Sequence, residues 1–149
     1  MFKQTPLILT VALMMAGALT SGCASRDLSR SAQNAEIGAP EPDRARIVVY
    51  RESGPFGLNA IRPALYLDAQ SLGPALPCAY RVIDIDPGEY VVSIGDTGHD
   101  QVTVTVGAGE TAYVQALVSN GADLLQGAVR STSVAEASAR VPTLNRVAL

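Results

Sequence analysis

The strongest constraint on the fold is a strict alternation of side-chain types in the second half of the chain. Val102, Val104 and Val106 alternate with polar residues, and side chains two positions apart point to the same face of a β-strand. After the reversal at Gly107-Ala108-Gly109, residues 112–119 alternate again. Two alternating runs joined by a glycine turn predict a pair of antiparallel strands.

Short β-type runs bounded by turn residues recur along the rest of the chain. They are Arg46–Arg51, Ala64–Leu67, Ala79–Ile85, Tyr90–Ile94 and a last one within Leu124–Arg130. A spacing of about ten residues per strand is typical of a β-sandwich. We therefore predict an all-β fold, an antiparallel sandwich of about seven strands within residues 45–149.

The sequence near the C-terminus predicts one short helix. Ser133 and Glu136 match the S-x-x-E capping box, in which each side chain satisfies an amide at the start of a helix. The helix should last about two turns, because Pro142 follows. The tail after it contains spaced apolar residues, and we expect it to dock on its own domain; a free tail could instead add to the sheet edge of a partner.

The N-terminus has the organisation of a targeting segment. Lys3 precedes an uncharged apolar run, residues 7–19, of about 13 residues, whereas a membrane-spanning helix needs about 20. Small residues then lead to Cys23 in the stretch LTSGCA. This resembles the bacterial lipobox, with Thr20 where leucine is commonest. An ordinary secretory signal and an uncleaved anchor are the alternatives.

The lipobox resemblance implies a processed and lipidated N-terminus. Residues 1–22 would be a lipoprotein signal peptide, cut between Gly22 and Cys23, and Cys23 would be the lipid attachment site. Several acyl chains hold a protein stably at a membrane, whereas one does so only marginally. Ala24 after the cysteine implies the outer membrane, with the domain facing the periplasm.

Residues 23–44 form the link between this anchor and the sandwich. The segment is rich in Ala, Ser, Pro and charged residues, so it cannot bury enough apolar surface to order itself. We predict a flexible tether with a root-mean-square span of roughly 25 Å.

Four stretches resemble a bacterial envelope domain family of unknown function, similar to PEGA-type sandwich domains. They are RIVVYR, ALYLDAQSLG, DIDPGEYVVSI and VTVTVGAGETAYVQALVS, within residues 45–131. The resemblance implies an Ig-like or transthyretin-like sandwich, commonly carried by lipoproteins, with no established catalytic residues. Ala69 stands where the hairpins of such domains usually carry glycine.

Few residues in the chain could perform chemistry. Lys3 is the only lysine and His99 the only histidine, and the net charge of −3 argues against a nucleic-acid partner. Asp84 and Asp86 could share a face as paired carboxylates, although we favour the simpler explanation that Asp86 opens a turn and Asp84 faces water near the strand end. With Cys23 acylated, Cys78 would lack a partner within the chain, as a buried inert thiol or as half of an intermolecular disulfide.

These observations favour a membrane-anchored bacterial lipoprotein that is not an enzyme and carries no cofactor or metal. We expect it to serve as a binding or structural module of the cell envelope, with an envelope protein as a possible partner. Two alternatives are a subunit of a larger envelope assembly and a hydrolase that uses Asp84, Asp86 and His99.

Overall fold

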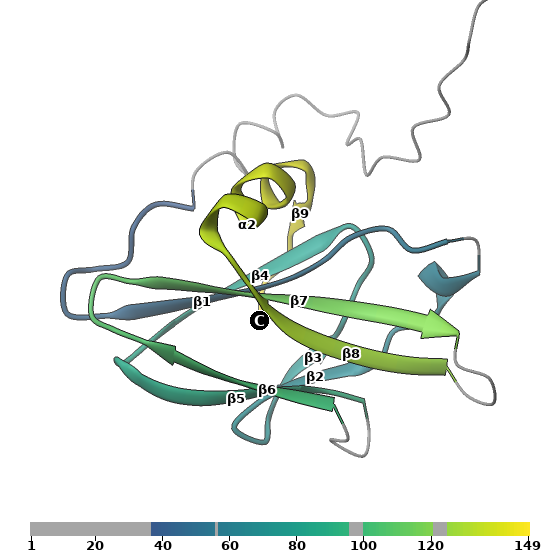
Figure 1. Cartoon of the computed structure of the whole chain (residues 1–149), viewed down its shortest axis with the longest axis horizontal. Helices are drawn as coiled ribbons and strands as arrows, with labels where there is room; N and C mark the ends of the chain where they lie inside the picture. Colours follow the sequence, from purple (N-terminus) through teal and green to yellow (C-terminus); the bar gives the residue numbers. More distant parts are fainter. Residues whose placement is uncertain (1–36, 56, 96–99, 121–124) are drawn as a thin grey trace, which may run out of the picture.

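A computed structural model describes residues 37–55, 57–95, 100–120 and 125–149, which form a β-sandwich with one short helix (Figure 1). The strands are β1 (Ala45–Arg51), β2 (Ala64–Leu67), β3 (Gln70–Pro74), β4 (Ala79–Ile85), β5 (Gly88–Ile94), β6 (Asp100–Val106), β7 (Thr111–Asn120), β8 (Leu125–Thr132) and β9 (Asn145–Arg146). One sheet has the order β8-β7-β1-β4-β9 and the other has the order β3-β2-β5-β6. The predicted all-β sandwich is confirmed.

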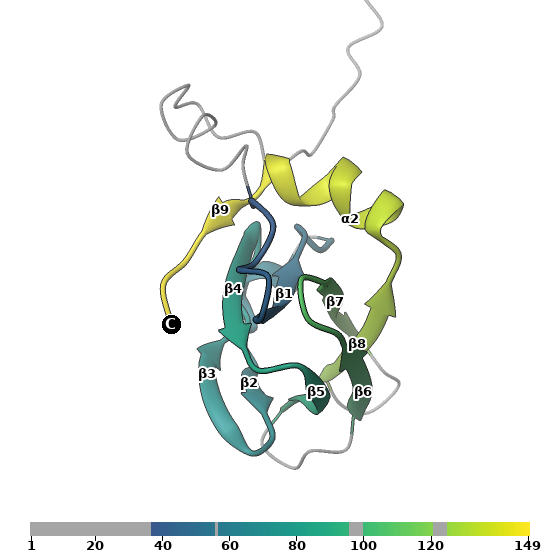
Figure 2. The same ribbon diagram turned by 90° about the vertical axis from the view of Figure 1, so that its left-hand side faces the viewer.

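The main core lies between the two sheets. Ile47 and Val49 of β1, Val92 of β5, and Val104 and Val106 of β6 are buried in it. The alternation in residues 101–106 thus has the predicted consequence, since the threonines of β6 point to solvent. At one side β8 lies against β6, and Figure 2 shows the two sheets converging there.

A third layer covers the outer face of the five-stranded sheet, as Figure 2 shows. It consists of helix α2 (Val134–Arg140) and a 3₁₀ turn η2 (Val141–Thr143), after which β9 joins the edge of the sheet beside β4. Ala137, Val141 and Leu144 are buried against Val48 and Tyr50 of β1. The predicted short helix and the docked tail are therefore both present, and they make a second, smaller core.

The start of α2 follows the capping-box prediction in part. The Ser133 hydroxyl accepts a hydrogen bond from the Glu136 backbone N–H at 3.2 Å. The Glu136 carboxylate accepts hydrogen bonds from Arg130 on β8. The carboxylate therefore ties the helix to the sheet.

The sheets are mixed, with nine strands where about seven were predicted. β1 pairs with β7 in parallel, and β4 pairs with β9 in parallel, whereas the remaining pairs are antiparallel. The additional strands are β3 and β9. Both are short, and β3 contains no β-branched residue, so neither carries a strong strand signal.

The hairpin between β2 and β3 is closed by a two-residue turn. Leu67 pairs with Gln70, and the two residues between them, Asp68 and Ala69, have φ values of 47° and 67°. Positive φ at both central residues defines a type I′ turn. The turn is of the tight hairpin type even though alanine occupies the position that usually carries glycine.

Residues 37–44, the last part of the predicted tether, lie on the domain. Ile37 packs against the second core, the Arg46 side chain donates a hydrogen bond to the Gly38 carbonyl, and Gly109 N–H donates to the Arg44 carbonyl at 2.8 Å. Gly22, Cys23 and the rest of residues 1–36 lie outside the described residues. Within the described ranges, no helix is long and apolar enough to cross a membrane.

Candidate functional site

A groove opens where β1 and β7 separate, and we call it the β1–β7 groove. The parallel pairing of the two strands ends at Tyr50 and Gln115, while β7 continues to Asn120. Beyond this point the chain after β1 rises away from β7 (Figure 1). The space between them has a volume of about 330 Å³, within the usual range of small-ligand pockets.

Glu52, from the chain just after β1, occupies the polar centre of the groove. Its carboxylate accepts a hydrogen bond from Gln115 Nε2 at 2.7 Å. The same carboxylate accepts two hydrogen bonds from Arg140 at the end of α2, at 2.7 and 2.6 Å. The hydrogen bond to Glu52 raises the pKa of Arg140. Three elements that are distant in sequence therefore meet at one carboxylate.

Gln115 is the most unusual residue of the groove. Its side chain is 4% exposed, and its Oε1 atom has no hydrogen-bond partner among the described residues. A buried polar atom without a partner costs about 1–3 kcal/mol. The oxygen is also shielded from solvent, so a donor bound in the groove would reach it only after the side chain moves.

The opposite wall of the groove is held by local hydrogen bonds. Asn59 lies in the 3₁₀ turn η1 (Leu58–Ala60). Its side chain accepts from Gly54 N–H at 2.8 Å and donates to the Ser53 hydroxyl at 3.0 Å. These contacts join Ser53 and Gly54 to η1, so the wall is held by hydrogen bonds of its own.

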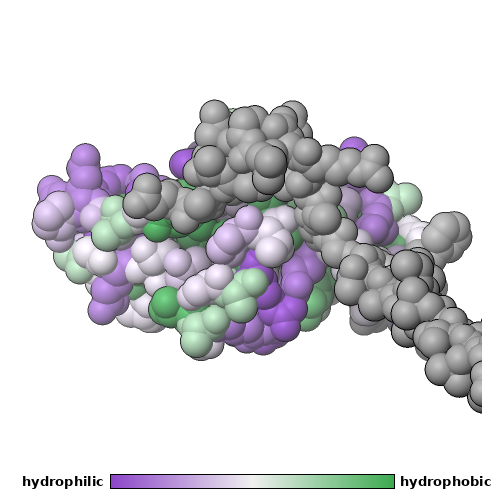
Figure 3. All heavy atoms as spheres, turned by 90° about the horizontal axis from the view of Figure 1, so that it is seen from above, coloured by the Kyte–Doolittle hydropathy of each residue, from purple (hydrophilic) through white to green (hydrophobic). Residues whose placement is uncertain are grey.

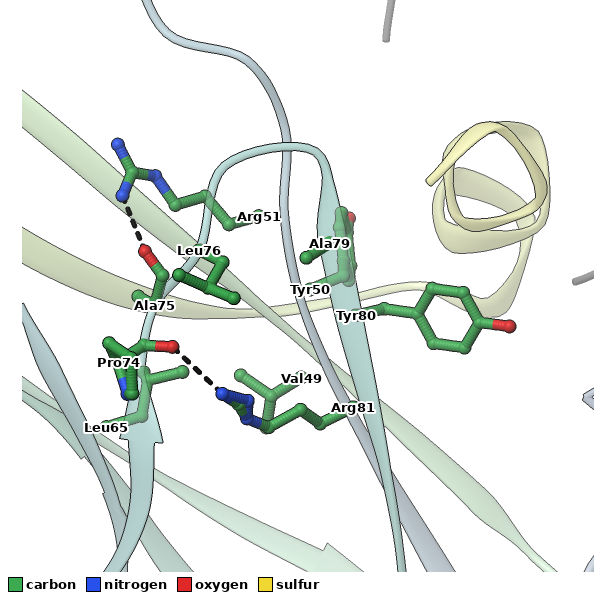
Figure 4. A pocket seen from close by; sticks show the side chains of 10 residues that line it. All are labelled: Val49, Tyr50, Arg51, Leu65, Pro74, Ala75, Leu76, Ala79, Tyr80 and Arg81. Carbon is green, nitrogen blue, oxygen red and sulfur yellow. Dashed lines mark hydrogen bonds between the residues drawn. The ribbon is translucent and has the colours of Figure 1, made fainter. Parts of the chain in front are cut away.

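Two buried arginines secure the same end of the sandwich. Arg51 is 3% exposed and Arg81 is 6% exposed. Arg51 donates to the carbonyls of Leu58, Ile61 and Ala75, and Arg81 donates to those of Leu72 and Pro74. Figure 4 shows both guanidinium groups directed at the 74–76 segment, while Tyr80 points away towards α2.

Neither arginine forms an ion pair with a carboxylate in the part of the chain that the structure describes. Burial lowers the pKa of both side chains, and Arg62 lowers that of Arg51 further. The cavity between them holds about 10 Å³, close to the room that one water molecule needs. We therefore assign a structural role to the two arginines and the small cavity between them. The β1–β7 groove, by contrast, has the size and polarity of a binding site.

The predicted acid/base pair Asp84 and Asp86 is engaged by arginines. Arg46 donates to both oxygens of Asp84, at 2.6 and 3.0 Å, and Arg44 pairs with Asp86. The hydrogen bond from Arg46 lowers the pKa of Asp84, which is the wrong direction for a general acid. His99 lies outside the described residues, so its distance from the two aspartates is not defined.

Cys78 is disulfide-bonded in the structure, and no cysteine of the described residues is free. The expectation of a buried inert thiol at Cys78 is therefore wrong, whereas its alternative was already a disulfide. Its φ is +53°, which a residue with a Cβ adopts only at a cost. The predicted lipid attachment site, Cys23, lies outside the described residues.

No group of three or more histidine, cysteine or acidic residues is placed to bind a metal within the described ranges. The groove residues Glu52, Gln115 and Arg140 were not singled out by the sequence. One signal pointed to Gln115, because it is the only polar residue between two flanking pairs of apolar residues, Tyr113-Val114 and Ala116-Leu117.

No protein-family model and no curated protein matches this chain. The family resemblance of residues 45–131 therefore rests on the four stretches that carry it.

Proposed function

We propose that this chain is a membrane-anchored bacterial lipoprotein whose small sandwich acts as a non-enzymatic binding module of the cell envelope. The single observation that carries the anchor is the lipobox-like stretch that ends at Cys23, after an apolar run too short to span a membrane. In this proposal the acyl chains on Cys23 hold the mature protein at the outer membrane, facing the periplasm.

The domain adds a reason to expect binding instead of catalysis. The β1–β7 groove combines a carboxylate, an arginine and an unsatisfied amide oxygen, groups that recognise a polar ligand. The carboxylates first considered for hydrolysis each have an arginine partner. The groove is therefore the surface that we assign to a partner.

Lipid labelling of the full chain tests the anchor. We expect radioactive palmitate to label the wild type and Cys78→Ser, and to be absent from Cys23→Ser. Cys78→Ser is the matched control, because it removes the other cysteine and leaves the lipobox intact. Mass spectrometry of the mature N-terminus should then show acylated Cys23. Equal labelling of Cys23→Ser, or recovery of Cys23 in a disulfide without acyl chains, would refute the anchor.

A further inference from the structure

We propose that the β1–β7 groove binds an extended peptide segment of a partner protein, carrying an acidic side chain, as an added strand on β7. The proposal deepens the binding role proposed above and names its partner class.

The first support is the exposed backbone edge of β7. The strand pairs with β8 from Tyr113 through Asn120. On its other side β1 accompanies it only as far as Gln115. Residues 116–120 therefore have a strand neighbour on one side only within the described part of the chain. Unpaired backbone N–H and C=O groups of this kind are a template for an added strand.

The second support is the contrast with the edge strand β3 in the other sheet. Arg81 donates to the carbonyls of Leu72 and Pro74 on β3, and Pro74 lacks an N–H group. A capped edge with a proline resists strand addition. The chain thus protects β3, while the edge of β7 opens into a preformed groove.

The third support is the set of side chains that face the groove. Leu117 is 38% exposed, one of the few exposed large hydrophobic residues of the described chain. It lies two positions after Gln115, so both side chains point to the same face of β7. The apolar side chain offers a contact for alternate residues of a bound strand.

The fourth support is charge. Arg140 is the exposed cation of the groove, because the Arg51 guanidinium is buried and donates to the carbonyls of Leu58, Ile61 and Ala75. Arg140 pairs with Glu52 at 2.6 Å and lies 3.9 Å from Glu136. Its side chain remains 43% exposed, and Glu52 accepts from its Nη1 group alone, so the other N–H groups can donate to a further carboxylate. An acidic side chain on the peptide would complete the network.

Figure 3 shows the molecule from above the view of Figure 1. Hydrophilic and hydrophobic residues are interspersed over the described residues that are visible there.

The test uses the full chain in detergent and a blocked, fluorescent hexapeptide of alternating valine and threonine with one central glutamate. Fluorescence anisotropy should show saturable binding. The same peptide with glutamine in place of glutamate should bind about tenfold more weakly, because a charge-assisted hydrogen bond is lost. The variant Arg140→Gln should remove this preference. Arg146→Gln, which deletes an equal charge on β9, should retain it.

Two N-methylated peptides test the strand geometry directly. Alternate N–H groups of a strand point to opposite edges, so methylation of one alternate set should abolish binding and methylation of the other should not. Equal effects of the two methylated peptides, or no binding of any peptide at millimolar concentration, would overturn the proposal. A chain that dimerises through Leu117, shown by loss of the dimer in Leu117→Asp, would also overturn it and place a second copy in the groove.

The outcome is separable from that of the anchor. Cys23→Ser should bind the glutamate peptide as the wild type does, whether or not palmitate labels the chain. Peptide binding with unlabelled Cys23 would refute the anchor alone, and labelled Cys23 without peptide binding would refute the groove proposal alone.

Discussion

Replacing Ala69 by glycine should stabilise the domain. Ala69 is an exposed residue at the second central position of the β2–β3 turn, with φ of 67°. A residue with a Cβ in this left-handed conformation costs about 1–2 kcal/mol, because the Cβ approaches the following carbonyl oxygen. The side chain contributes no burial that the substitution would forfeit.

The expected gain is the difference between two terms. Glycine removes the Cβ strain of about 1–2 kcal/mol but loses about 0.5–1 kcal/mol more conformational freedom on folding than alanine. The two terms leave a rise of about 0–1.5 kcal/mol in the free energy of unfolding, centred on ~0.75 kcal/mol, which corresponds to roughly 3–6 °C in Tm for a domain of this size. Asp68 should remain, because its carboxylate accepts from Val91 N–H at 2.8 Å.

Urea unfolding followed by far-ultraviolet circular dichroism measures the change, since the chain contains no tryptophan. The matched control is Ala108→Gly in the β6–β7 turn. Ala108 is also exposed but is not among the residues with positive φ, so the control should lose about 0.5–1 kcal/mol. A stability of Ala69→Gly at or below the wild type, or an equal gain in Ala108→Gly, would refute the reasoning.

Three further predictions concern packing, pH and the edge of β3. A Cβ on Gly127 would lie 3.0–3.2 Å from three atoms of Ile94, so Gly127→Ala should lower the free energy of unfolding, measured by thermal unfolding, by about 1 kcal/mol. Ile94→Val in the same chain should recover part of this loss, and no recovery would contradict the clash. Arg46 lowers the pKa of Asp84, so the folded state binds fewer protons than the unfolded state, and the stabilisation by this pair is complete above about pH 5 and is lost as the pH falls through the folded pKa. Arg46→Gln should flatten the fall in unfolding free energy below about pH 5, and an unchanged slope would count against the pair. Arg81→Met leaves two carbonyls without their donor, so the free energy of unfolding should fall by about 2–5 kcal/mol, and light scattering should detect concentration-dependent aggregation. A monomeric variant of unaltered stability would show that the arginine does not protect the edge of β3.

The sequence predicted those parts of the fold that depend on local pattern. The alternation of β6 reports its buried face directly, and Ser133 marks the start of α2. The parallel partners of β1 and β4 were not predicted, since antiparallel neighbours are the expectation for short strands joined by tight turns. β3 was assigned partly to a turn, because its strand state depends on pairing with β2 and on carbonyl contacts with Arg81, which no local pattern reports.

The groove was not predicted for a related reason. Glu52 is 63 residues from Gln115 and 88 residues from Arg140, so their meeting depends on the topology of the sheet. The sequence predicted an alternating strand over residues 112–119, and a glutamine between apolar neighbours on that strand could have been recognised as a buried polar group. The residues chosen for chemistry, Asp84 and Asp86, are instead held by neighbouring arginines.

The central position of β1 has a kinetic consequence for a chain that is synthesised N-terminus first. β1 is the first strand of the domain, yet its neighbours are β4 and, in parallel, β7, whose register with it reaches Gln115. Non-local pairing of this kind folds slowly, because the loop must close before the contacts form. The five-stranded sheet therefore cannot close around β1 until residue 115 has been made.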